Sequence, residues 1–194
     1  MRTYRNRISI LGIVCLLLLS IIFAQTATPS QNQPEKKPTT IFTLHLLAFN
    51  SLIKSNLEKD VKALDESFKM SIPIYHPALG LNLSFYTKLT QKGLPYPSMI
   101  NRILKNVVLA LNPINLPDNT NINIVLYAED EKDPYNSKTL FLTFTLSALK
   151  EYSKTKDLNK FGSRIIGFLE TDKLEYKDGI FTSKNYNFEW ILKI

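Results

Sequence analysis

Apolar side chains recur at two spacings along the chain, and these spacings predict helices and strands. Residues 41–68 contain no Pro or Gly, and their apolar positions lie three or four residues apart, as in an amphipathic helix packed on a core. Residues 41–48 could alternatively form a strand. The same spacing returns after Pro97 and predicts a second long helix, which Pro113 and Pro117 end. Its apolar positions are Ile100, Ile103, Leu104, Val107, Val108 and Leu111.

Between and after these helices, apolar side chains alternate with polar ones, which predicts strands with one buried face. In the run 68–75 the alternation places four side chains on the buried face: Phe68, Met70, Ile72 and Ile74. Pro73 has no N–H to donate, so this run is predicted to be an edge strand. The other predicted strands are 79–89, 121–128, 139–146, 164–170, 174–177, 180–183 and 186–194.

Local signals complete the predicted fold. Asp178-Gly179 predicts a hairpin with a type I′ turn, because both central residues of that turn need a positive φ. Ser147 is the predicted N-cap of a short helix through Tyr152, and Trp190 is predicted to be buried in the last strand. The order of elements predicts an α+β fold with one mainly antiparallel sheet built from hairpins, covered on one face by two long helices and one short helix.

Residues 1–24 have the three parts of a secretory signal peptide. Arg2, Arg5 and Arg7 form a basic start, residues 8–24 are uncharged and largely apolar, and a small residue, Ala24, offers a cleavage site. Cleavage would release the protein to the periplasm or the cell exterior. The alternative is an uncleaved anchor that faces outward, with membrane contact only through residues 8–24, which are at the short end of the roughly 17–25 residues needed to span a bilayer.

Residues 25–40 are predicted to be a flexible linker, and residues 41–194 a single domain. The linker holds three Pro and one apolar side chain, Ala27, so it cannot bury enough surface to offset the entropy of ordering. Cys15 lies in the predicted signal and is the one cysteine of the chain. The cleaved chain would therefore be free of cysteine, which excludes disulfides, thiol nucleophiles and thiolate metal ligands.

Charge argues against specific recognition of nucleic acids. The chain has a formal net charge of +7, which falls to +4 once the three Arg of the signal are removed. Of the remaining cations, all but Arg102 and Arg164 are Lys, whereas bidentate recognition of guanine or phosphate favours Arg. The mild positive charge is interpreted as a contribution to solubility.

Motifs for cofactor chemistry are missing from the sequence. It contains no Gly-x-Gly-x-x-Gly, His-Glu-x-x-His or Gly-x-Ser-x-Gly. Gly162 and Gly167 have the spacing of a phosphate-binding loop, but Phe168-Leu169 stands where Lys and Ser or Thr are needed. We expect no cofactor.

His76 is the one weak catalytic candidate. The alternation places it on the apolar face of its strand, just before Pro77, where burial could tune its pKa for general-base catalysis. A structural histidine at the end of a strand is the alternative.

The acidic residues Glu129, Asp130 and Asp133 are weak candidates for a cation site. They lie in a predicted loop between two strands, and carboxylate oxygens are the ligands of Ca²⁺. Their spacing does not match a calcium-binding loop, and Pro134 follows them. We therefore expect a solvated hairpin tip and no metal.

Three tyrosines form a possible contact surface. Tyr75, Tyr86 and Tyr127 are predicted to lie on the sheet face opposite the main apolar one, beside Val125 and Phe141. If that face is open, it is a candidate binding surface.

These features favour an exported, non-enzymatic envelope domain that binds a protein partner or a small ligand. One alternative is a secreted hydrolase that uses His76. The other is a membrane-anchored structural component of an envelope or secretion assembly, with residues 8–24 retained.

Overall fold

The computed structural model describes residues 49–194 except positions 52, 58 and 63–64. The chain divides into two units, Met1–Pro38 and Thr39–Ile194, and all described residues belong to the second. The predicted signal peptide, the predicted linker and the open question about residues 41–48 lie outside the described residues. In the described part of the chain, no helix is both long and apolar enough to cross a membrane.

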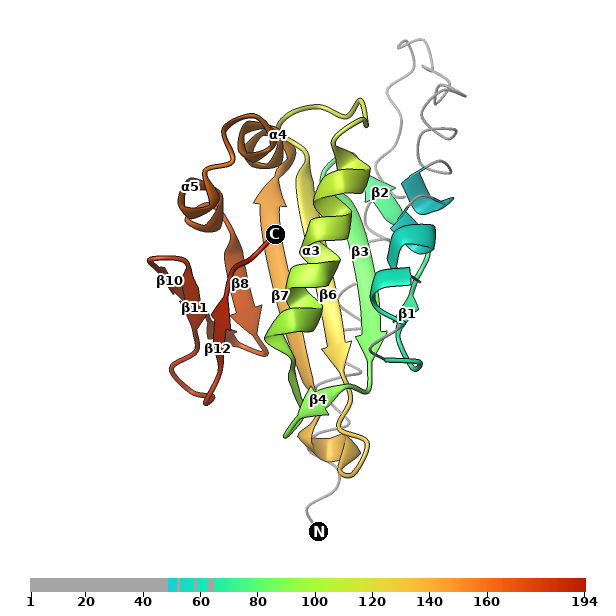
Figure 1. The fold of residues 1–194 in the computed structure, drawn as a ribbon, viewed down its shortest axis with the longest axis vertical. Helices are drawn as coiled ribbons and strands as arrows, with labels where there is room; N and C mark the ends of the chain where they lie inside the picture. The colour runs from blue at the N-terminus through green and yellow to red at the C-terminus, as the bar shows by residue number, and fades with distance from the viewer. Residues whose placement is uncertain (1–48, 52, 58, 63–64) are drawn as a thin grey trace, which may run out of the picture. The chain divides into compact units, whose positions relative to one another are not determined.

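The main sheet has seven strands, and most of its pairs are antiparallel (Figure 1). The strands along it are β1 (Lys69–Met70), β3 (Gly80–Thr87), β6 (Asn121–Ala128), β7 (Lys138–Thr145), β8 (Ile166–Leu169) and β9 (Asp172–Lys173), and β2 (Ile74–His76) also pairs with β3. The mixed α and β content and the mainly antiparallel pairing are confirmed. The β3–β6 pair is parallel, so the expectation that hairpins build the sheet does not hold for this pair.

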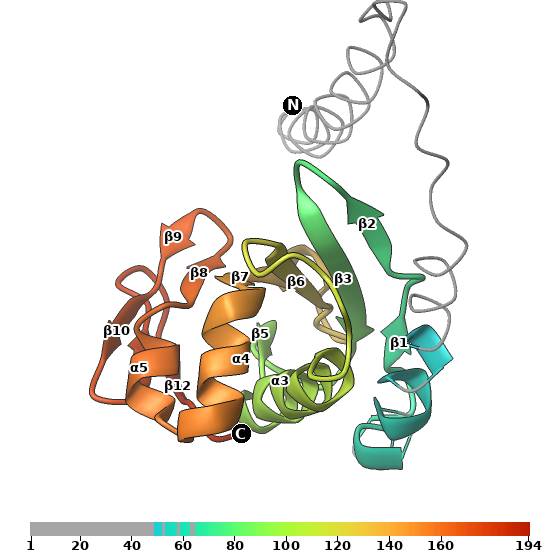
Figure 2. The same ribbon diagram turned by 90° about the horizontal axis from the view of Figure 1, so that it is seen from above.

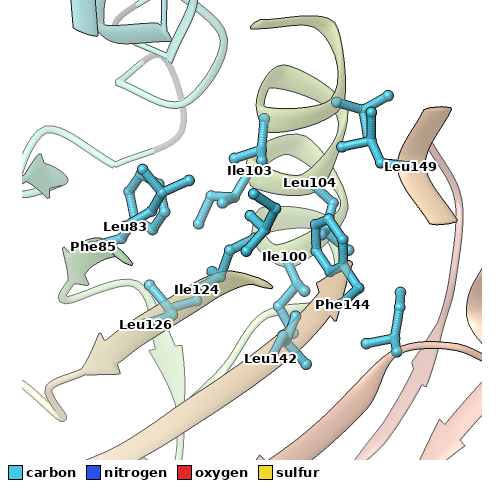
Figure 3. Packing of buried hydrophobic residues seen from close by; sticks show 14 of the residues in the cluster. Leu83, Phe85, Ile100, Ile103, Leu104, Ile124, Leu126, Leu142, Phe144 and Leu149 are labelled. Carbon is cyan, nitrogen blue, oxygen red and sulfur yellow. The ribbon is translucent and has the colours of Figure 1, made fainter. Parts of the chain in front are cut away.

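A parallel pair needs a crossover, because the chain must return to the same end of the sheet. Helix α3 (Pro97–Leu111) makes this crossover between β3 and β6. Its buried residues include Ile100, Ile103 and Leu104, which point toward the side chains of the central strands (Figure 3). The helical spacing in the sequence therefore identified this face of α3 correctly.

The other helices lie on the same side of the main sheet as α3 (Figure 2). They are α4 (Leu146–Thr155) and α5 (Leu158–Gly162). Helical residues also occur within 49–60. The N-cap of α4 is Thr145, whose side chain accepts from the Ala148 N–H at 3.3 Å, and not Ser147 as predicted. Asp157 caps α5, a helix too short for a periodic apolar pattern to reveal.

Two small sheets and one 3-10 turn complete the described structure. The first small sheet pairs β4 (Thr90–Gln91) with β5 (Leu94–Pro95), and the turn η1 spans Pro134–Asn136. The second contains β10 (Glu175–Lys177), β11 (Ile180–Thr182) and β12 (Glu189–Ile191). The predicted turn between β10 and β11 is confirmed, with φ of 51° at Asp178 and 87° at Gly179. These strands form a sheet of their own instead of extending the main one.

One extra residue interrupts the edge of the main sheet. Met70 of β1 pairs with Phe85, whereas Ile74 of β2 pairs with Asn82, so three residues on the edge (71–73) lie opposite two on β3 (83–84). Such a bulge reverses which face each later side chain occupies. Ile72 and Ile74 are accordingly 78% and 66% exposed, and their predicted burial is wrong. The bulge contains Pro73, which cannot donate to the ladder.

Asn101 of α3 attaches the C-terminal strand to the core. Its Oδ1 accepts from Trp190 Nε1 at 2.8 Å and from the Lys193 N–H at 3.0 Å, and its Nδ2 donates to the Ile191 carbonyl at 2.9 Å. The Trp190 ring is fully buried and stacks on Phe181 at 4.5 Å between centroids. The predicted burial of Trp190 is confirmed.

We expect Trp190→Ala to lower the free energy of unfolding by roughly 3–5 kcal/mol, the range for large core truncations. Trp190→Phe keeps a ring against Phe181 but loses the hydrogen bond to Asn101, so it should cost less. Chemical denaturation measures both values. A cost below about 1 kcal/mol for Trp190→Ala would show that the packing of β12 on α3 is wrong.

Candidate functional site

The two faces of the main sheet differ in what covers them. On β6, Ile122, Ile124 and Leu126 are almost completely buried because they face the helices. Val125 points the other way and is half-buried, and Tyr127 is 40% exposed. Each labelled helix lies on one side of the central strands (Figure 2). The outer face, defined as the side of β3, β6, β7 and β8 away from these helices, is therefore open among the described residues.

Aromatic side chains gather on the outer face. Tyr86 pairs directly with Tyr127, and their rings stack with centroids 5.8 Å apart and an interplanar angle of 19°. Phe141 pairs with Phe168, and those rings lie 6.5 Å apart at a tilt of 45°. Val125 pairs with Phe141 and joins the two groups. Together these five side chains lie on one face across four strands, and we call them the aromatic patch.

A row of polar side chains borders the aromatic patch. Asn82, Asn123 and Thr143 are paired across β3, β6 and β7. The Asn123 Nδ2 donates to Asn82 Oδ1 at 3.0 Å and to the Leu79 carbonyl at 2.8 Å, and Thr143 Oγ1 donates to Asn123 Oδ1 at 2.8 Å. Each amide is held by its neighbour, so this edge of the patch has a fixed orientation.

Glu129 borders the patch on the opposite side. The Tyr86 hydroxyl donates to Glu129 Oε2, and the Lys88 ammonium lies 3.9 Å from Glu129 Oε1. Partial burial and the hydrogen bond to this carboxylate raise the pKa of Tyr86 to about 12. The hydrogen bond from its hydroxyl to Glu129 and the stacking of its ring on Tyr127 fix the orientation of Tyr86.

Asp65 fixes the end of β3 that carries Tyr86. One carboxylate oxygen accepts from the Ser67 N–H and hydroxyl at 2.8 and 2.6 Å. The other accepts from the Thr87 hydroxyl and from the N–H groups of Lys88 and Leu89, the last two at 3.1 and 3.3 Å. Burial opposes ionisation of this carboxyl, but the hydrogen bonds outweigh it and lower the pKa of Asp65.

The bulge separates Tyr75 from the other two tyrosines of the predicted contact surface. Tyr75 pairs with Leu81, which is buried, and packs against the core cluster. It therefore lies on the helix side of the sheet, whereas Tyr86 and Tyr127 share the outer face as expected. The predicted neighbours Val125 and Phe141 also lie on that face.

His76 is exposed and lies at the edge of the sheet, opposite Gly80. Its Nδ1 accepts from the Ala78 N–H at 3.1 Å, a local contact within the turn after β2. The prediction that His76 lies on the apolar face of the sheet is therefore wrong. The cause is the same as for Ile74: the bulge separates both residues from β1, whose predicted face is correct.

Asp130 and Asp133 of the acidic loop accept hydrogen bonds from other residues of the same loop. Asp130 accepts from the Lys132 N–H at 3.0 Å and from the Asn136 amide at 3.1 Å, and these bonds lower its pKa. Asp133 accepts from the Tyr135 N–H at 3.1 Å and caps η1, while Glu129 accepts from Tyr86. Among the described residues, no group of three or more His, Cys, Asp or Glu could hold a metal ion.

Searches of protein-family models, curated proteins and solved structures found no match for this chain.

The sequence predicts some residues of the outer face but not all of them. Tyr86, Tyr127, Val125 and Phe141 lie in long alternating runs, so their common face could be predicted. Phe168 cannot be assigned to this face from the sequence, because β8 has four residues, too few to define a face without its pairing to β7. The Asn82–Asn123–Thr143 row also depends on the strand register, and in particular on the parallel β3–β6 pair.

We expect the hydrogen bonds to Asp65 to make the protein sensitive to acid. Because its folded pKa is lowered, the stabilisation is complete above the unfolded pKa of about 3.9 and disappears as the pH falls through the folded value. Asp65→Asn should therefore be less stable than the unmodified protein at pH 7, and the difference should shrink toward pH 3. Urea unfolding at several pH values measures this.

Glu66→Gln is the matched control, since it removes the exposed carboxylate next to Asp65. Its effect on the free energy of unfolding should be small at every pH. A constant difference between Asp65→Asn and the unmodified protein from pH 7 to pH 3 would contradict the assignment.

Proposed function

We propose that this chain is an exported, non-enzymatic domain of the cell envelope that binds a protein partner through the outer face of its sheet. The observation that carries the proposal is the aromatic patch on a sheet face that no described helix covers. Exposed apolar groups of this kind, bordered by polar side chains, mark interaction surfaces.

The composition of the outer face matches the centre of a protein interface. Tyr and Phe are enriched at interface cores, whereas charged residues are depleted there and occur at the rim. Here the centre consists of Tyr86, Tyr127, Val125, Phe141 and Phe168. Lys69 and Lys173 lie opposite Tyr86 and Phe168 on the neighbouring edge strands, which places charge at the rim.

The side chains of the aromatic patch and of the amide row are also preorganised for binding. Tyr86 is held by Glu129 and by stacking on Tyr127, and the amide row is held by its own hydrogen bonds. Side chains that are already ordered lose less entropy on association, which leaves more of the contact energy for affinity. A partner with a flat, partly apolar surface, such as another sheet or a helix, suits this face best.

Export is the second part of the proposal, and it rests on the basic, apolar and small-residue order of residues 1–24. We expect protein isolated from the cells that produce it to begin at Gln25 or within a few residues of it. Intact-mass measurement with N-terminal sequencing checks this. Recovery of the chain with Met1 from membranes would contradict cleavage and favour the membrane-anchored structural component instead.

A photo-crosslinker tests the outer face directly. With a benzophenone amino acid in place of Tyr127, irradiation of intact cells should give a discrete protein adduct. The same group in place of Leu109 is the matched control, because Leu109 is an exposed apolar residue on α3, on the helix side of the sheet. Phe141→Ser in the Tyr127 crosslinking variant should reduce the adduct at least about threefold, since it removes the centre of the patch.

The outcome that would contradict the proposal is equal crosslinking from positions 127 and 109, or none from position 127. Circular dichroism and thermal unfolding of the crosslinking variants show whether the fold is retained. Tyr127 is 40% exposed and stacks on Tyr86, so its replacement by another aromatic residue should change the free energy of unfolding by no more than about 1 kcal/mol.

A further inference from the structure

A hollow of about 240 Å³ lies between the β4–β5 hairpin, the start of α3 and residues 187–189, which lead into β12. Figure 1 shows β4 below the lower end of α3 and β12 to the left of it. Pro95 and Phe188 are buried beneath the hollow, and Tyr96 is half-buried in its wall. Its exposed rim carries Gln91, Lys92, Asn187 and Glu189.

The hairpin wall of the hollow is rigid. Lys92 and Gly93 form its two-residue turn, with φ of 53° and 75°. A Cβ on Gly93 would lie 1.8 Å from the Asn136 carbonyl oxygen, so the turn rests against the loop between β6 and β7. Pro95 and Pro97 restrict the backbone further on, because their rings fix φ. The backbone that carries Gln91 and Lys92 at the rim of the hollow is thus held in one conformation.

The opposite wall is held by Asp172. Its carboxylate accepts from the Ser183 hydroxyl, from the Asn185 N–H at 3.1 Å and from the Asn185 amide at 2.8 Å. The Ser183 N–H in turn donates to the Phe188 carbonyl at 3.2 Å. These bonds fix the loop that places Asn187 and Glu189 at the rim, so both walls are formed before any ligand arrives.

We propose that this hollow binds a neutral saccharide ring. The rim has one cation, Lys92, and one anion, Glu189, so its formal charge is balanced among the described lining residues. Gln91 and Asn187 each carry amide donors and an acceptor, which suits adjacent hydroxyl groups that both donate and accept. Tyr96 adds a half-buried aromatic side chain to the wall, and aromatic rings pack well on the C–H face of a sugar.

The size of the hollow favours a compact ring over an extended peptide. Pockets that enclose drug-sized ligands have roughly 300–1,000 Å³, so this hollow holds a single ring. An extended peptide advances about 3.3–3.6 Å per residue, and most of its length would lie outside. A proline-rich peptide, which aromatic grooves also recognise, is therefore the less favoured ligand.

Titration of the full chain followed by ¹⁵N NMR tests this proposal. The probes are methyl glucoside, N-acetylglucosamine and maltose, each up to about 50 mM, a range suited to a Kd on the order of 1–10 mM. At least one of them should produce saturable shifts of the Gly93 and Asn187 amides. Glycerol is the control for nonspecific hydroxyl effects, and a capped triproline peptide represents the other ligand class.

Alanine substitutions of the two rim amides test whether the saccharide binds in the hollow. Gln91→Ala and Asn187→Ala should each raise the Kd at least about threefold, the loss of one hydrogen bond. Asn115→Ala is the matched control, since it removes an exposed amide from another loop. The proposal is overturned if no saccharide gives saturable shifts at these amides, if the variant that combines Gln91→Ala with Asn187→Ala binds unchanged, or if triproline binds and the saccharides do not. None of these results bears on the outer face, which lies on other strands.

Discussion

The packing of α3 on the parallel β3–β6 pair is the interaction on which the rest of the structure depends. The crossover places the apolar face of α3, with Ile100, Ile103 and Leu104, over the central strands (Figure 3). It also brings Asn101 to the C-terminal segment, so that one helix covers the sheet and anchors β12. Because α3 covers one face of the sheet, the side chains on the outer face do not contribute to this core and are available for binding.

The outer face follows from that constraint together with the register of the strands. Pairing of β3 with β6 brings Tyr86 to Tyr127, and pairing of β7 with β8 brings Phe141 to Phe168. The same alternation that buries Ile124 places Val125, one residue later, half-buried on the outer face. The proposed binding surface and the hydrophobic core are therefore two consequences of a single sheet with helices on one side.

Local patterns predicted the elements more reliably than their pairing. The helical spacing of α3, the alternation in β6 and β7, and the Asp178-Gly179 turn each carry their signal within a short segment, and each was confirmed. The single-residue bulge between Met70 and Ile74 has no such signal beyond Pro73. It reverses the faces of Ile74, Tyr75 and His76 together, so three misplacements share one physical cause. The parallel β3–β6 pair was also missed, because nothing within either strand distinguishes a crossover from a hairpin.

The most direct test of this account compares two neighbouring residues on β6. Ile124 faces the helices and is 2% exposed, while Val125 lies on the outer face. A soluble nitroxide broadens the NMR signals of methyl groups that it can approach, so the methyl groups of these two residues report on the two faces separately. The account predicts strong broadening for Val125 and little for Ile124. Equal protection of both would show that the outer face is covered in the protein itself, and it would contradict the proposal that this face is free for a partner.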